Sequence, residues 1–147
     1  MKINHVTKEY GIYGMLFSLS NRIQTIGDKE FNDITMKQHF FMIALELFDE
    51  APTLKQMGEL MGCSYQNVKR MATQLEKRNY LIIQQSEEDK RKLLLVSTGR
   101  FEKLAIESRE ATMKFMKNLY KEIPQENLEV TLHTLKKMDQ NLGGLIE

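Results

Sequence analysis

The residues with the clearest chemistry lie between positions 64 and 77, where apolar side chains recur every three or four positions. A helix with that period buries one face and turns the other outward at 100° per residue. Gln66 and Arg70 lie on the outward face, and their amide and guanidinium groups can bond adenine and guanine edges bidentately. Ser64 and Tyr65, at the helix start, can donate to phosphate. The predicted DNA-contacting residues of this helix are Ser64, Tyr65, Gln66, Asn67, Lys69, Arg70 and Thr73.

An ordinary solvated helix face would show similar residues, so the neighbouring elements decide the interpretation. Thr53, with Gln56 three positions on, is a capping-box signature for a preceding helix barely two turns long. Gly62 is placed to end that helix, because glycine takes the left-handed conformation without steric cost. Ser64 is a good N-cap for the second helix. Two short helices joined by a tight turn are typical of a helix-turn-helix.

A β-hairpin is predicted directly after the second helix, which Asn79 can close in the left-handed conformation. Apolar, β-compatible runs at 81–83 and 93–96 flank a polar segment at 84–92. A helix-turn-helix followed by a charged hairpin predicts a winged helix.

The tip of this wing carries three further predicted DNA contacts, Lys90, Arg91 and Lys92. They can enter a minor groove or bind phosphate, and Asp89 can orient Arg91 by a charge-assisted hydrogen bond. The alternative is a charged turn kept polar for solubility, because the neighbouring glutamates oppose phosphate.

Three stretches resemble the MarR family of bacterial winged-helix regulators: residues 54–64, residues 75–81 and the wing-tip run 89–91. The Asp-x-Arg of the wing is the most recognisable local feature. The sequence departs from the family's pattern at Asn79, where glycine is usual, and after the second wing strand, where only Thr98 remains of a Leu-Thr-x-x-Gly run. The resemblance implies dimerisation through N- and C-terminal helices.

The composition is that of a single globular domain of 147 residues, 41% hydrophobic and 28% charged. The longest apolar run, Phe40 to Leu45, is too short to span a bilayer, and residues 1–5 resemble no signal peptide. One cysteine, Cys63, is compatible with a reducing compartment. We therefore expect a cytoplasmic protein with no membrane partner.

The net charge of +1 does not by itself indicate nucleic-acid binding, but the basic residues are unevenly distributed. Residues 53–92 hold eight Lys/Arg against five Asp/Glu, whereas residues 101–147 hold seven against eight. The basic excess therefore lies in the winged-helix segment, which favours phosphate contact there.

Four helices are predicted around the wing and the helix-turn-helix. One runs from Val6 to about Ile26, and one follows a second capping box at Thr35 and continues through Phe48. After the wing, Thr98 can cap a long helix to about position 120, and Pro124 suits the first turn of the last helix.

The outermost helices carry apolar side chains that one short chain cannot bury. The last helix has a heptad-like seam with Asp139 at the missing position. Burial against a second subunit is the simplest solution. The predicted dimerisation residues are Val6, Tyr10, Leu128, Leu132, Leu135, Leu142 and Ile146.

Other sites are predicted weakly or not at all. Aromatic residues could bound an effector cavity, although aromatics at helical spacing are more often core; they are Tyr13, Phe17, Phe40 and Phe41. Cys63 precedes a helix N-terminus, where a thiolate is favoured, but a lone cysteine in a turn is usually filler. The histidines lack partners at metal-ligand spacing, and no catalytic constellation or cofactor motif stands out.

The sequence thus predicts a mainly α chain: a winged helix-turn-helix lobe at 35–97, with helical dimerisation regions at 1–30 and 98–147. The predicted function is a homodimeric transcriptional regulator, not an enzyme, that binds pseudo-palindromic duplex DNA. We expect a repressor relieved by a small apolar or aromatic effector, without metal or cofactor. The alternative is a winged-helix protein-interaction module without DNA affinity, which the near-zero net charge favours.

Overall fold

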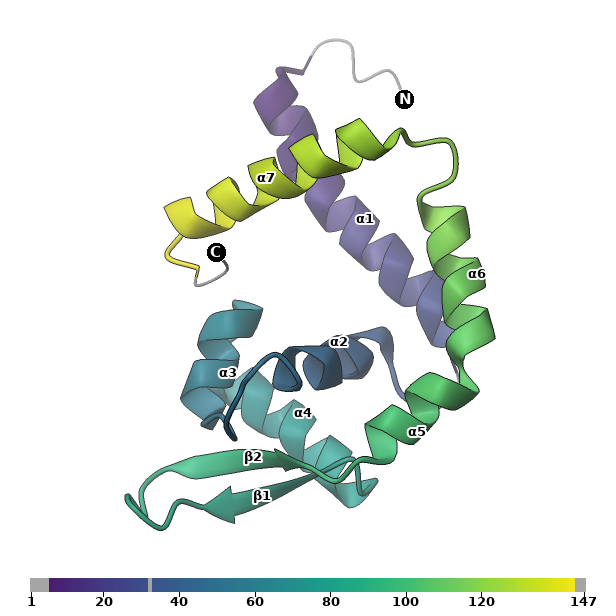
Figure 1. The fold of residues 1–147 in the computed structure, drawn as a ribbon. Coiled ribbons are helices and arrows are strands. Elements are labelled where there is room, and N and C mark those ends of the chain that lie inside the picture. Colours follow the sequence, from purple (N-terminus) through teal and green to yellow (C-terminus); the bar gives the residue numbers. More distant parts are fainter. Residues whose placement is uncertain (1–5, 32, 145–147) are drawn as a thin grey trace. The chain divides into compact units, whose positions relative to one another are not determined.

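The computed structural model describes residues 6–31 and 33–144. Within these ranges the fold is mainly helical, with one two-stranded antiparallel sheet, as predicted (Figure 1). The chain divides into two compact units, Met1–His39 and Phe40–Glu147, and helix α2 crosses the division. The elements are α1 (Lys8–Glu30), α2 (Met36–Leu45), α3 (Leu54–Met61), α4 (Tyr65–Lys77), β1 (Leu81–Gln85), β2 (Leu93–Ser97), α5 (Arg100–Glu107), α6 (Arg109–Leu119) and α7 (Gln125–Asn141).

Helix α1 extends four residues beyond the predicted end near Ile26. Its last turn is tied to the start of α2. Gly27 is buried against Met36, whose side chain leaves no room for a Cβ at position 27. Asp28 accepts the backbone N–H of Met36 at 2.6 Å. This cap and the close approach are contacts between segments that the local period does not reveal.

The capping box predicted at the start of α2 is present. The Gln38 N–H donates to the hydroxyl of Thr35, and the Thr35 N–H donates to the Gln38 side chain. The helix ends at Leu45 rather than Phe48, because the N–H groups of Leu47 and Phe48 bond to carbonyls only three residues back. No helix in the described ranges is long and apolar enough to cross a membrane.

The three signals for the helix-turn-helix, the Thr53–Gln56 capping box, Gly62 and Ser64, are confirmed. Thr53 and Gln56 form a reciprocal capping box on α3, and Gly62 ends that helix at φ 62°, in the left-handed region. Ser64 caps α4 by accepting the N–H of Asn67 at 3.3 Å. Asn79 follows α4 with φ 60°, as expected of the left-handed residue at its end.

The core of the unit Phe40–Glu147 joins α2, α3, α4, the wing strands and α5. Its fully buried side chains come from every one of these elements except α5, which contributes Phe101 at 7% exposure. The largest fully buried side chains are Phe41, Met42, Leu54, Met57, Val68, Leu75, Tyr80, Leu81 and Leu95. This core holds the second helix of the motif and the wing in one lobe.

The wing is attached to α3 as well as to α4. Strands β1 and β2 pair in register from Leu81 opposite Ser97 to Gln85 opposite Leu93. The N–H of Leu95 donates to the carbonyl of Pro52 at 2.9 Å, and Thr53 forms a β-bridge with Leu94. The first turn of α3 is therefore fixed to the base of the wing.

The prediction of a single long helix after the wing is wrong. The chain bends at Ser108, which separates α5 from α6. The Ser108 hydroxyl donates to the carbonyl of Leu104 at 2.7 Å, a side-chain bond that often bends helices.

The predicted caps of the last helices are also shifted. Gly99, not Thr98, is the N-cap of α5, and the Thr98 hydroxyl donates to the carbonyl of Asn79 at 2.6 Å while accepting the N–H of Arg100 at 3.4 Å. Pro124 stands one residue before α7, at the N-cap rather than in the first turn.

Candidate nucleic-acid interface

Helix α4 presents a polar face along the side opposite its buried residues. Val68, Met71, Ala72 and Leu75 are buried, which fixes the rotation of the helix. The predicted base-reading side chains then divide by exposure. Four are exposed and Thr73 is half-buried, with its hydroxyl donating to the carbonyl of Lys69 at 2.9 Å. The exposed four are Gln66, Asn67, Lys69 and Arg70.

Two polar side chains lie at the start of α4: Ser64, which caps the helix, and Tyr65, which is exposed. Ser64 is exposed, and its hydroxyl oxygen caps the helix, so donation to a phosphate would have to coexist with this bond. Tyr65 is 46% exposed. The first turn of α4 carries no acidic residue, so the partial positive charge of the helix start is not neutralised there.

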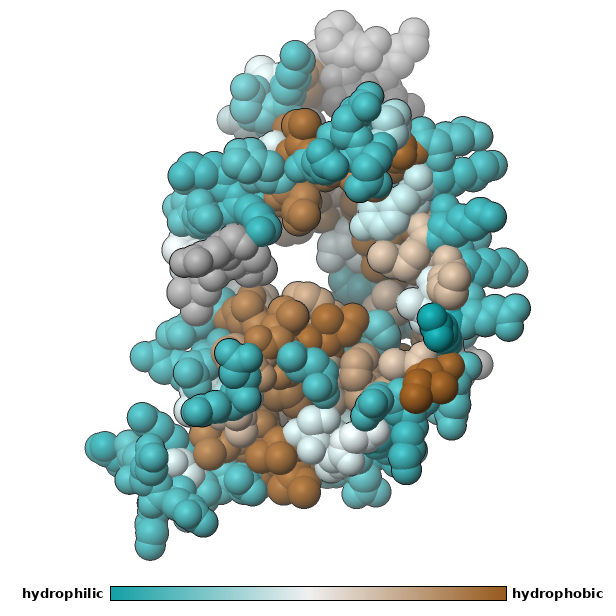
Figure 2. Space-filling view, in the orientation of Figure 1, coloured by the Kyte–Doolittle hydropathy of each residue, from teal (hydrophilic) through white to brown (hydrophobic). Residues whose placement is uncertain are grey.

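The wing tip is organised by Asp89. Its carboxylate accepts two hydrogen bonds from the Arg91 guanidinium, at 3.1 and 3.2 Å, and one from the Arg91 backbone N–H at 3.1 Å. These bonds hold the pKa of Asp89 below its ordinary value. Lys90, Arg91 and Lys92 are exposed, and Figure 2 shows the tip covered by hydrophilic side chains. Asp89 therefore fixes the direction of Arg91, as expected from the sequence.

Two contacts that join α4 to its neighbours are not apparent in the sequence. The Glu76 carboxylate accepts the N–H of Ile83 in β1 at 2.7 Å, which fixes the wing to α4. Arg100, the first residue of α5, donates to the carbonyl of Arg78 at 2.6 Å and lies 4.8 Å from the ring centroid of Tyr80. The paired residues are 7 and 22 positions apart, beyond the three- and four-residue spacings that a helix pattern reveals.

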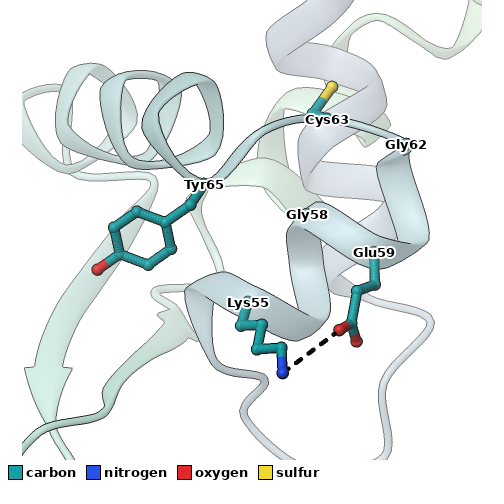
Figure 3. Close-up of a pocket in the computed structure, with 6 residues that line it drawn as sticks. All are labelled: Lys55, Gly58, Glu59, Gly62, Cys63 and Tyr65. Carbon is teal, nitrogen blue, oxygen red and sulfur yellow. Dashed lines mark ion pairs between the residues drawn. The ribbon is translucent and has the colours of Figure 1, made fainter.

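A depression of about 360 Å³ lies between the first turn of α3, the start of α4 and the wing. Its charged and polar lining includes Lys55, Glu59, Tyr65, Arg91 and Lys92. A second depression of about 320 Å³ shares Lys55, Glu59 and Tyr65 and continues to Cys63 (Figure 3). The sequence interpretation included Tyr65 and the wing residues but overlooked Lys55.

The predicted dimerisation residues are mostly exposed within the single chain. Val6, Tyr10, Leu132, Leu135 and Leu142 are between 37% and 90% exposed. Leu128 is half-buried, and Ile146 lies outside the described residues. In the described part of the chain, α6 and α7 contain no buried residue.

The predicted effector residues lie in two units. Tyr13 and Phe17 belong to Met1–His39, are exposed, and form an edge-to-face pair with centroids 5.1 Å apart. In Phe40–Glu147, Phe40 is 49% exposed and Phe41 is fully buried in the core. The other candidate, Cys63, is half-buried, and its thiol donates to the carbonyl of Met61 at 3.6 Å.

The family model for the MarR family matches residues 34–93, the stretch from the start of α2 to the first residue of β2. That segment belongs to the MarR family. The resemblance noted in the sequence is thereby confirmed. None of the curated proteins compared with the chain matches it.

Solved structures extend the likeness beyond this segment. A MarR protein from Peptoclostridium difficile has a TM-score of 0.80 at 18% identity, over 97% of this chain and 92% of its own. Bordetella bronchiseptica BpsR, whose DNA binding is regulated by 6-hydroxynicotinic acid, has a TM-score of 0.75 at 19% identity, over 92% and 96%. MepR of S. aureus, in complex with DNA, has a TM-score of 0.75 at 19% identity, over 88% and 97%. The chain thus has the fold of MarR-family transcriptional regulators.

Proposed function

We propose that the chain is a sequence-specific DNA-binding transcriptional regulator that acts as a homodimer on pseudo-palindromic sites. The observation that carries the proposal is the pairing of α4 with the wing in one lobe. The buried face of α4 turns Gln66 and Arg70 outward, and Glu76 ties the same helix to β1. Base-reading side chains and the exposed basic residues of the wing tip are thus held in one lobe.

Each part of this scaffold has a separate role in the proposal. Gln66, Asn67 and Arg70 enter a major groove and read base edges, while Ser64, Tyr65 and Lys69 contact phosphate. The wing residues Lys90, Arg91 and Lys92 contact the backbone or an adjacent minor groove. This is a binding role with no catalytic step, and it places the protein with the chromosome in the cytoplasm.

The dimer follows from the apolar residues that the single chain leaves uncovered. Leu132 and Leu135 of α7, Leu142 directly after that helix, and Tyr10 of α1 are exposed, and a second copy would bury them. Two-fold pairing places two recognition helices about 34 Å apart, one turn of duplex. In the proposal, residues 1–30 and 98–147 form the dimer, and residues 35–97 bind DNA.

Relief of repression by a small molecule is the regulatory part of the proposal. BpsR supports it, because 6-hydroxynicotinic acid regulates that protein's DNA binding. In this chain the exposed edge-to-face pair Tyr13 and Phe17 of α1 would contact an aromatic effector. It would stabilise a spacing of recognition helices that does not match the duplex. The effector can shift the equilibrium only by the difference between its binding free energies for the two states, typically about 1–3 kcal/mol.

A gel-shift titration of random duplex at low and moderate salt tests DNA binding. We expect retardation at low salt that weakens as salt rises, because phosphate contacts release counterions. A winged-helix module that binds only proteins would leave the duplex unshifted at every salt concentration.

A further inference from the structure

The depression between α3, α4 and the wing has an excess of positive charge. Three of its lining residues are basic, Lys55, Arg91 and Lys92, and one is acidic, Glu59. They come from two segments almost 40 positions apart. The Pro52–Leu95 hydrogen bond and the adjoining β-bridge hold these segments together. The basic groups therefore converge because of the fold and not because of a local run of charge.

Lys55 occupies a position where it does not help its own helix. It lies in the first turn of α3, where the helix dipole favours acids and disfavours bases. It is also N-terminal to its partner Glu59, the less favourable order for an i,i+4 pair. Lys55 is a basic residue at the helix end that disfavours positive charge, and it lies beside two other basic residues. This position is better explained by an anionic ligand than by a contribution to helix stability.

Glu59 is the charge partner of Lys55. The two groups lie 3.8 Å apart and both are exposed, with side-chain exposures of 83% for Lys55 and 46% for Glu59. Figure 3 shows them on one face of α3, directed away from the sulfur of Cys63. Such an exposed pair is weak and exchanges readily for a stronger anion.

We infer that this depression binds one backbone phosphate of duplex DNA, with Lys55, Tyr65 and Lys92 as its contacts. This rests on the proposed function and adds α3 to the DNA-contacting surface. The phosphate replaces Glu59 as the partner of Lys55, and Glu59 limits the affinity for DNA of any sequence. The contact joins the helix-turn-helix and the wing on one strand of the backbone, so it contributes affinity without reading bases.

The test is fluorescence anisotropy of wild-type protein and Lys55→Ala on a selected genomic site and a random duplex, across several KCl concentrations. Loss of one phosphate contact lowers the slope of log affinity against log salt by about 0.9. Over a fourfold rise in salt, the variant should therefore lose about 3.5-fold less affinity than wild type. At low salt, Lys55→Ala should lose the same factor of affinity for both duplexes. Lys103→Ala, an exposed base on α5, is the matched control and should keep the wild-type slope.

Glu59→Gln gives an opposite expectation from the same site. It should tighten binding to both duplexes by about twofold, from removal of an exposed opposing charge, and by less in a Lys55→Ala background. Thermal melts check that each variant is folded. Wild-type binding with a Lys55→Ala slope equal to that of Lys103→Ala would overturn the phosphate site alone. Failure of the wild type to bind either duplex would overturn the proposed function itself.

Discussion

Glu76 is the residue for which electrostatics and structure make opposite predictions. It lies on the recognition helix, so its charge opposes phosphate, and its removal would strengthen DNA binding if charge alone mattered. Yet its carboxylate accepts the N–H of Ile83 at 2.7 Å and fixes the wing to α4. We predict that the structural effect dominates and that Glu76→Ala weakens DNA binding.

The estimated free energies indicate that the lost hydrogen bond outweighs the removed repulsion of phosphate. A hydrogen bond to a charged group contributes about 1.5–3 kcal/mol, and partial exposure of Glu76 puts its contribution near the lower end. A half-exposed charge near phosphate contributes less than about 1 kcal/mol at moderate salt. Loss of about 1.5 kcal/mol of stability should lower Tm by about 3–6 °C in a chain of this size. Glu76→Gln retains a neutral hydrogen bond and should lose about half as much.

The assay combines a thermal melt, backbone amide exchange and anisotropy on one duplex. Glu76→Ala should lower Tm, speed exchange of the Ile83 amide and weaken binding. Glu88→Ala, which removes an exposed acid at the wing tip, is the control and should bind as well as wild type or better. A Glu76→Ala variant with an unchanged Tm and tighter binding would show that Glu76 acts through its charge and not through its hydrogen bond to Ile83.

Three further predictions concern base reading, assembly and pH. Arg70→Ala should weaken specific binding by about 1–3 kcal/mol and relax preference at one base position, and equal binding of all single-base variants by the wild type would refute it. Leu135→Asp should yield folded monomers that lose the operator, while Val130→Asp, on the opposite face of α7, should remain dimeric by sedimentation; a monomeric wild type that still binds its operator would exclude the dimer. Because Arg91 lowers the pKa of Asp89, the stabilisation from that pair is present above the ordinary value of 3.8 and lost only as pH falls below it. An NMR titration midpoint for Asp89 at or above 3.8 would contradict this.

Local signals in the sequence were sufficient for the helix-turn-helix. The Thr53–Gln56 box, Gly62 and Ser64 each act within three or four residues, so their spacing determines the caps that form. Asn79 is similar, because a left-handed residue is required where α4 gives way to β1.

Contacts over longer separations explain what the sequence did not reveal. Thr98 resembles an N-cap, but its hydroxyl bonds to the carbonyl of Asn79, 19 residues away. The bend at Ser108 depends on a side-chain rotamer that the helical period does not specify. Lys55 was overlooked because its importance arises from wing residues that only the fold brings near it.

The central claim is that this lobe recognises DNA by sequence, and the most direct measurement is a specificity ratio. Genomic fragments retained by the purified protein would be sequenced, and the recovered site compared with a scrambled duplex by anisotropy at physiological salt. A sequence-specific regulator should bind the recovered site at least about 10³-fold more tightly. Affinities within tenfold of each other, or no binding to either duplex, would contradict the claim.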